Sequence, residues 1–327
     1  MFTFSTVMKR KLIRQGDPEH GSYTVTLPAP WVKKYGLKAG EEIDVEEIGN
    51  SLSMTAKKDV NVPKSVTIDA RGFTTVTQLR RNIAEAYRSG AETIEVLYKD
   101  VKLYHTRTQR HTRFKDEIEH IVANELLGME IEKSIPGMII MKQFSEAIEE
   151  EFDTAFRKIY YKLQDQVDQA IHALHTMKPE HLRSVWAGDR GINKFCNFCM
   201  RILNKKGHVD VRSQNEFYAA LVQLEFVGDM IYMIPMTLAG IKAKKANPKI
   251  LELLEDIKTA IALHSQYFYD RDEERFIKIL KLREKYFEAE KESFKEDGVY
   301  AASVTRIGLC FELLVNLRDT IVGIQKH

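Results

Sequence analysis

The chain has 327 residues, 44% of them hydrophobic and 29% charged, with a formal net charge of +2 at pH 7. This composition is typical of a globular protein of two or three domains, and it excludes a polycation that binds nucleic acid through its overall charge. Three cysteines without a disulfide framework fit a reducing cytoplasm, and no apolar run approaches the roughly 18 residues of a membrane span, so membrane insertion is not expected.

The first segment, about residues 8–58, is predicted to be a small β-rich unit. A strand is expected at residues 22–27, a short helix at 28–35 and a hairpin at 42–54, with Gly49-Asn50-Ser51 at its tip. Residues 8–38 contain seven Lys or Arg and two Asp or Glu, whereas residues 41–47 contain five acids and no base. A unit this small cannot bury a core alone, and a dimer with a basic face is one way that proteins grip DNA.

The same segment resembles the AbrB/SpoVT swapped-hairpin family. After the basic cluster, the shared motifs are Gly-Ser-Tyr-x-Val-Thr-Leu-Pro at 21–28, Trp-Val-Lys-Lys at 31–34 and Gly-Leu-Lys-Ala-Gly-Glu-Glu-Ile-x-Val at 36–45. The resemblance implies an intertwined homodimer whose basic loops contact DNA. The best candidate contacts by position are Lys9, Arg10, Lys11 and Arg14, with Lys33 and Lys34 as second choices. Gln15, Ser22 and Thr24 are candidates for reading bases by side-chain type. The alternative is a dimerisation module with solvated charges.

The second segment, about residues 64–144, is predicted to be a small α+β domain. Strands are expected at 65–68, 93–98, 129–131 and 137–141, and helices at 75–89 and 116–127, which end at Gly90 and Gly128. The basic stretch at 102–113 is interpreted as a solvated surface loop, with a phosphate-backbone contact as the alternative. No catalytic spacing is present here.

The third segment, about residues 145–327, is predicted to be entirely helical. Six helices are expected, at 144–176, 180–206, 211–244, 248–270, 272–297 and 300–325. Residues 224–234 align with residues 314–324 at an offset of 90, which indicates two three-helix bundles in tandem. The third helix of each bundle is apolar nearly all round and should be buried. The predicted fold class is therefore multidomain α+β, with a swapped-hairpin β domain, an α+β middle domain and an all-α body.

Two acids on the third predicted helix are the candidate metal ligands. Glu225 and Asp229 are four residues apart, so they share one helix face among apolar neighbours. Their desolvation and mutual repulsion must be offset by a metal ion, a protonated acid or a basic partner such as Arg201 or Arg190. Carboxylate oxygens suit iron, manganese or magnesium.

The helical body resembles the PhoU family, whose repeats carry an acid, three residues and then Asp on the third helix. Glu225 and Asp229 match this motif, and Asp189 and Asn193 stand at the spacing of the family's second acidic pair. The resemblance implies a metal at these four residues. In the second repeat Asp319 remains but Val315 replaces the acid, so a second cluster is not expected. Cys196 and Cys199 are interpreted as core residues rather than zinc ligands.

An AbrB-like head on a PhoU-like body resembles archaeal phosphate-uptake regulators. The leading hypothesis is therefore a homodimeric, cytoplasmic, DNA-binding transcriptional regulator of phosphate homeostasis with a helical sensing body. The alternative is an adaptor that docks on a phosphate transporter or a signalling kinase without binding DNA. An antitoxin would share the head, but about 180 helical residues argue against it. No nucleophile–base pair supports an enzyme.

Overall fold

The computed structural model describes residues 9–16, 22–48, 51–55, 65–106, 109–144, 150–206, 211–240, 246–293, 295 and 298–323. The chain divides into two compact units, Met1–Val60 and Asn61–His327. The predicted middle and helical segments thus belong to a single C-terminal unit. The expected hairpin tip at Gly49-Asn50 and the predicted helix ends at 145–149, 241–244 and 324–325 lie outside the described residues.

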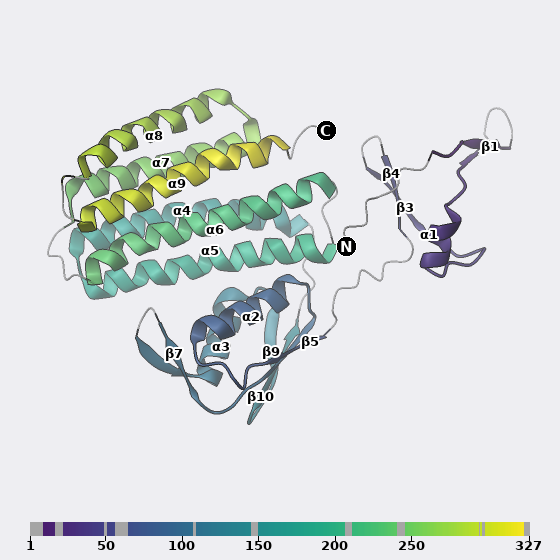
Figure 1. Cartoon of the computed structure of the whole chain (residues 1–327), viewed down its shortest axis with the longest axis horizontal. Helices are drawn as coiled ribbons and strands as arrows, with labels where there is room; N and C mark the ends of the chain where they lie inside the picture. The colour runs from purple at the N-terminus through teal and green to yellow at the C-terminus, as the bar shows by residue number, and fades with distance from the viewer. Residues whose placement is uncertain are drawn as a thin grey trace. The chain divides into compact units, whose positions relative to one another are not determined.

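The N-terminal unit consists of two hairpins and one short helix (Figure 1). Its elements are β1 Ile13–Gln15, β2 Ser22–Thr24, α1 Ala29–Lys34, β3 Asp44–Ile48 and β4 Ser51–Thr55. Both hairpins are antiparallel, with Thr24 opposite Ile13 and Thr55 opposite Asp44. The strand predicted at 22–27 therefore ends at Thr24, because β1 offers no pairing partner beyond Ile13. Helix α1 has proline in its first turn, where a missing N–H costs no hydrogen bond.

Within its described residues, the N-terminal unit buries no side chain. Leu12, Tyr23 and Leu52 are instead 72%, 64% and 64% exposed. So much apolar surface on so short a segment is unfavourable in water. The described residues of a single copy therefore form no core, which agrees with the expectation from the sequence.

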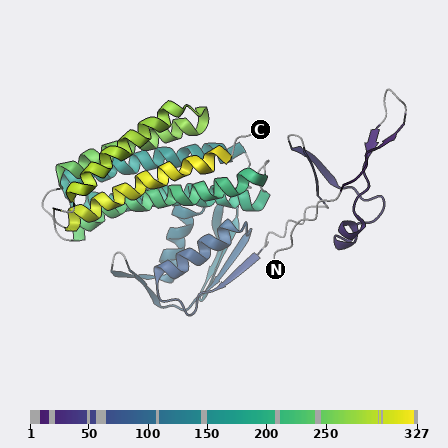
Figure 2. The ribbon, with the colours of Figure 1, turned by 45° about the horizontal axis from the view of Figure 1, so that its top comes forward.

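The C-terminal unit begins with a four-stranded sheet of order β5-β6-β10-β9. Strand β5 is parallel to β6, and the other two pairs are antiparallel. The strands are β5 Ser65–Asp69, β6 Thr93–Leu97, β9 Met129–Ile135 and β10 Met138–Gln143. Helices α2 Val76–Arg88 and α3 Phe114–Glu125 cover one face of this sheet and separate it from the helical bundle (Figures 1 and 2).

The ends of α2 and α3 follow local sequence signals. Thr75 and Gln78 form a capping box at the start of α2. Gly90 (φ 93°) and Gly128 (φ 74°) then take the left-handed backbone conformation shortly after each helix. The predicted helix stops at these two glycines are confirmed.

Residues 102–113 were predicted to be a loop, and this prediction is wrong. They form a second hairpin, β7 Lys102–His105 and β8 Arg110–Arg113. Leu103 and His105 point inward, whereas Lys102 and Tyr104 are exposed, so the sequence alternates with the period of a strand. Its cationic and polar residues obscure this alternation.

The remainder of the C-terminal unit is a bundle of long helices, as predicted. The described helices are α4 Glu150–Thr176, α5 Pro179–Lys206, α6 Val211–Gly240, α7 Pro248–Asp270, α8 Glu273–Ser293 and α9 Gly298–Gly323. Helices α4–α6 pack on one another, as do α7–α9, and the two sets meet mainly through α6 with α9 and α4 with α7 (Figure 1). One hydrophobic core joins both sets of helices, and a separate core lies between the sheet and helices α2 and α3.

Two of these helices, α6 and α9, are long and apolar enough to span a membrane by length and composition. The expectation that no stretch reaches that length is therefore wrong. About half of each apolar window is buried, and the two helices pack against each other. The central helices of a soluble bundle have the same properties, so this feature is weak support for a membrane span.

Candidate functional site

The basic residues of the N-terminal unit lie on its surface. Lys9, Arg10, Lys11 and Arg14 are all exposed, and Arg14 stands on β1 opposite Tyr23. They form a continuous cationic segment ahead of and within the first hairpin. Such a segment can contact phosphates without base selectivity.

The three candidate base-reading residues share one face of the first hairpin. Gln15 is paired with Ser22, and Thr24 is paired with Ile13, so all four side chains point to the same side. Thr24 also donates a hydrogen bond from Oγ1 to the Ile13 carbonyl at 3.3 Å. Arg14 projects from the opposite face. The hairpin therefore does not bring Arg14 and the three polar candidates together.

The second-choice contacts, Lys33 and Lys34, lie in the last turn of α1. Both are exposed, and the Lys34 ammonium lies 5.2 Å from the centroid of the Tyr35 ring. A cation in the last turn also interacts favourably with the helix dipole, so local stability explains part of this placement.

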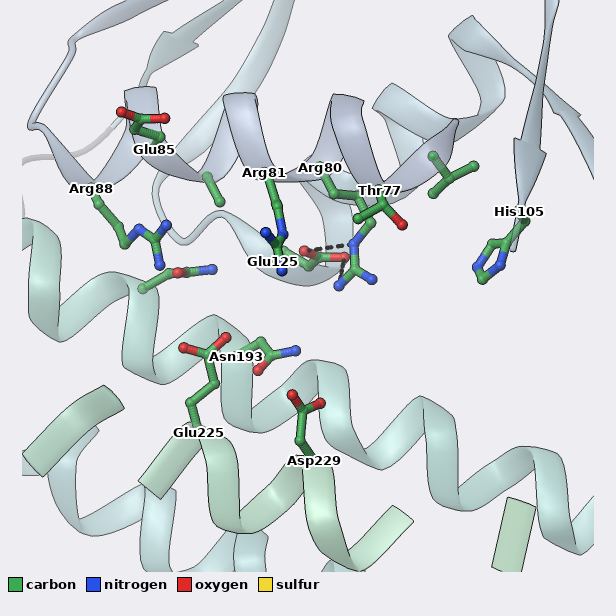
Figure 3. Close-up of a pocket in the computed structure, with 13 residues that line it drawn as sticks. Thr77, Arg80, Arg81, Glu85, Arg88, His105, Glu125, Asn193, Glu225 and Asp229 are labelled. Carbon is green, nitrogen blue, oxygen red and sulfur yellow. Dashed lines mark hydrogen bonds and ion pairs between the residues drawn. The ribbon is translucent and has the colours of Figure 1, made fainter. Parts of the chain in front are cut away.

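The C-terminal unit contains a polar pocket of about 440 Å³ between α2, α5 and α6 (Figure 3). The α2 wall carries Arg80, Arg81 and Arg88, and the α6 wall carries Glu225 and Asp229. The whole lining is Val76, Thr77, Arg80, Arg81, Ala84, Glu85, Arg88, His105, Glu125, Asn193, Asn197, Glu225 and Asp229. Its volume falls within the range of small-molecule sites.

The surroundings of Glu225 disfavour the ionised form of its carboxyl. Burial raises the pKa of this carboxyl, Arg88 opposes that effect, and the neighbouring carboxylate of Asp229 adds to it. Arg88 and Arg80 of α2 therefore act on Glu225 through space, which fits the basic-partner alternative with arginines other than those named from the sequence. Their spacing gave no signal, because the partner helix lies more than a hundred residues away along the chain.

Arg80 forms an ion pair with Glu125 in the lining of the pocket (Figure 3). Its Nη2 lies 2.8 Å from Oε1 of Glu125, and its Nε donates to Oε2 at 3.2 Å. Glu125 is buried at the end of α3, so this pair ties α2 to α3. Nearby, burial raises the pKa of Glu117, and the charges of Arg190 and Arg80 oppose that rise.

Of the two arginines suggested as possible basic partners of the acidic pair, Arg201 is engaged elsewhere. Arg201 donates from Nη1 to the Tyr87 carbonyl at 2.6 Å and from Nη2 to Oε1 of Gln143 at 2.8 Å, so this prediction is wrong. Arg190 interacts electrostatically with Glu125, Glu117 and Asp189.

The metal hypothesis combined Glu225, Asp229, Asp189 and Asn193. Asp189 accepts hydrogen bonds from Asn193 Nδ2 at 3.3 Å and from Gln166 Nε2 at 3.5 Å. Across the described ranges, no group of three or more His, Cys, Asp or Glu is placed to hold a metal ion. The donor set does not fit a metal.

The predicted core cysteines are buried. Cys196, Cys199 and Cys310 are free thiols inside the bundle, and burial raises the pKa of each. Thiols in such surroundings are poor nucleophiles and poor ligands.

Comparison with known proteins matches only the N-terminal unit. Residues 20–60 match the family model described as "Antidote-toxin recognition MazE, bacterial antitoxin". The match covers about an eighth of the chain and includes β2, α1 and both strands of the second hairpin. It is consistent with a swapped-hairpin domain of the AbrB type, a class that dimerises and binds DNA in regulators and antitoxins. No curated protein and no solved structure matches the chain.

Proposed function

We propose that this protein is a homodimeric, cytoplasmic DNA-binding transcriptional regulator and not an enzyme. The observation that carries the proposal is the family match at residues 20–60 in a unit whose apolar side chains are exposed in one copy. Pairing two copies would cover that surface and present the segment from Lys9 to Arg14 twice. Doubling the cationic residues doubles the number of phosphates that one molecule can contact.

A salt titration of DNA affinity tests this proposal. Duplexes selected from a random pool would be bound by the full chain, and the logarithm of affinity would fall linearly with the logarithm of salt concentration. The triple variant Lys9→Ala, Arg10→Ala and Arg14→Ala removes six charges per dimer. It should reduce the slope by up to about 5, because each phosphate contact contributes about 0.9.

The control is a second triple variant on α8, Lys278→Ala, Lys281→Ala and Lys291→Ala. These lysines are equally exposed and remove the same charge. They should leave both affinity and slope near those of the unchanged protein. If no DNA is retained even at low salt, the adaptor hypothesis is favoured. If DNA binds but neither triple variant affects its affinity or slope, the contacts assigned to Lys9, Arg10 and Arg14 are wrong.

We further propose that the regulated genes serve phosphate uptake and that the helical bundle senses or transmits the signal. Support comes from the resemblance of the bundle to PhoU repeats and from the two stacked three-helix sets. Mapping of bound genomic sites under phosphate limitation and phosphate excess tests this link. Sites unrelated to phosphate genes, unchanged between the two conditions, would contradict it.

An antitoxin is the second candidate, because the matched family model carries that description. In that case the helical bundle would bind a toxin protein. Co-purification of the full chain with a growth-inhibiting protein encoded beside it, and rescue of growth by the chain, would distinguish this function from phosphate regulation.

A further inference from the structure

The pocket between α2, α5 and α6 separates opposite charges on facing walls. Figure 3 shows Arg80, Arg81 and Arg88 directed from α2 towards α6, and Glu225 and Asp229 directed back towards them. Glu85, the acid on the α2 wall, points away from the α6 acids in the same view. The lining therefore offers a positive side and a negative side a short distance apart.

The facing charges are not joined by direct ion pairs at two key positions. In the described part of the chain, neither Arg81 nor Glu225 has a salt bridge or hydrogen bond to another side chain. Arg88 and Arg80 interact with Glu225 electrostatically through space. Their charges lower the pKa of its carboxyl, whereas burial raises it. Two such groups facing each other across an open space are suited to a molecule that pairs with both.

The floor of the pocket adds a hydrogen-bonding group. Asn193 is 9% exposed, and its Oδ1 has no hydrogen-bond donor among the described residues. Its Nδ2 already donates to Asp189, so the amide is fixed in orientation. A buried acceptor without a donor is unfavourable, and a ligand N–H at this position would relieve it.

We propose that this pocket binds a small zwitterion with one anionic group and one ammonium or guanidinium group. The carboxylate or phosphate would lie against Arg81 and Arg88, and the cationic group would lie between Glu225 and Asp229. The lining has three arginines and four acids, so it favours neither a simple anion nor a simple cation. Binding of the zwitterion does not depend on DNA recognition. The idea that the bound zwitterion acts as a regulatory signal rests on the proposed function.

Calorimetric titration of the full chain tests the proposal in the presence of EDTA. The probes are the twenty amino acids and phosphoethanolamine, with inorganic phosphate and ethylamine as the two separate halves of a zwitterion. At least one zwitterion should bind about ten- to a hundredfold more tightly than either half, since each charge-assisted contact contributes in that range. Absence of binding by every zwitterion, equal binding of phosphate alone, or binding that requires a metal would overturn the proposal.

Variants of the positive and the negative wall then locate the site. Arg81→Ala and Glu225→Gln should each weaken the zwitterion at least tenfold, and Arg88→Gln provides a second test of the positive wall. Lys278→Ala on α8 is the control and should change nothing. Unchanged affinity in both pocket variants would overturn the assignment even if a zwitterion binds. DNA affinity measured without ligand should stay unchanged in these variants, so failure here is distinguishable from failure of the proposed DNA-binding function.

Discussion

The guanidinium of Arg201 on α5 contacts both the backbone carbonyl and the aromatic ring of Tyr87, near the C-terminal end of α2. Its Nη1 donates to the Tyr87 carbonyl at 2.6 Å, and its carbon Cζ lies 4.7 Å from the centroid of the same residue's ring. Its Nη2 also binds Oε1 of Gln143, so one buried cation joins α2, β10 and the bundle. The contact lies next to Arg88, the last residue of the positive wall of the pocket.

Arg201→Met should therefore destabilise the C-terminal unit by about 3 kcal/mol, since hydrogen bonds to charged groups contribute about 1.5–3 kcal/mol. The variant leaves the Tyr87 carbonyl and Gln143 without their donor. Chemical denaturation followed by circular dichroism measures the change. Lys194→Met is the control on the same helix, because Lys194 makes a single bond to the Ala123 carbonyl at 3.2 Å. An equal loss in both variants would contradict the role assigned to Arg201.

A buried histidine should make the bundle sensitive to acid. His264 on α7 is fully buried, its Nδ1 lies 3.0 Å from the Tyr160 hydroxyl, and burial lowers the pKa of its imidazole from 6.5 to about 3. Between pH 6.5 and about 3, His264 is protonated in the unfolded chain but neutral in the folded chain. The free energy of unfolding should therefore fall as pH drops from 6.5 towards 3, by at most about 1.4 kcal/mol per pH unit from this group.

His264→Phe should flatten this pH dependence, while it lowers stability at pH 7 because Tyr160 loses its partner. Denaturant titrations between pH 7 and 4 give the slope for both proteins. His175→Phe, on the exposed side of α4, is the matched control. The prediction fails if His264→Phe keeps the full acid sensitivity of the original chain.

The helices could be predicted from local signals, but their meeting points could not. Pro179 and Pro248 start helices, and Gly90 and Gly128 follow the ends of helices. Each of these signals determines a helix end from only a few neighbouring residues of the sequence. The approach of Arg88 to Glu225 depends on how α2 packs across α5 and α6. That packing is set by side-chain shape over long chain separations, which periodicity does not encode.

Two features formed by polar residues could not be predicted from the sequence: the β7–β8 hairpin and the partner of Arg201. Strand β7 alternates between exposed and buried residues, but the cationic side chains of β7 and β8 have the composition of a solvated loop. Arg201 is one of two arginines suggested from the sequence as possible partners for the acids of α6, and instead it donates to the Tyr87 carbonyl at the end of α2. A cation in a helix has many possible partners, and only the tertiary fold selects one.

Helix α9 carries a glycine that close packing requires. A Cβ on Gly308 would overlap the hydroxyl and ring of Tyr286 on α8, whose hydroxyl donates to Oε1 of Glu290 at 2.7 Å. Gly308→Ala should therefore cost about 1–3 kcal/mol, as is usual when a packed core is overfilled. Thermal denaturation of the full chain measures the change.

Gly191→Ala on α5 is the matched control with the opposite expected sign. Its added Cβ would meet only the flexible Lys162 side chain, at 3.4 Å. Relief of glycine's backbone entropy should then stabilise the chain by about 0.5–1 kcal/mol. Two substitutions of the same kind that both stabilise would show that Tyr286 moves aside freely.

Dimerisation of the N-terminal unit should depend on its exposed apolar side chains. Leu52 on β4 is 64% exposed in one copy and stands opposite Glu47 in the hairpin register. Leu52→Lys should shift the protein towards monomer, because burying a charged ammonium in the contact between two copies costs desolvation free energy. Analytical ultracentrifugation of the full chain over a range of concentrations measures the shift, and selected DNA should bind more weakly in parallel. Val101→Lys alters an exposed apolar residue of the C-terminal unit and should leave the mass unchanged. If the Leu52 variant remains a dimer that binds DNA normally, another surface joins the two copies.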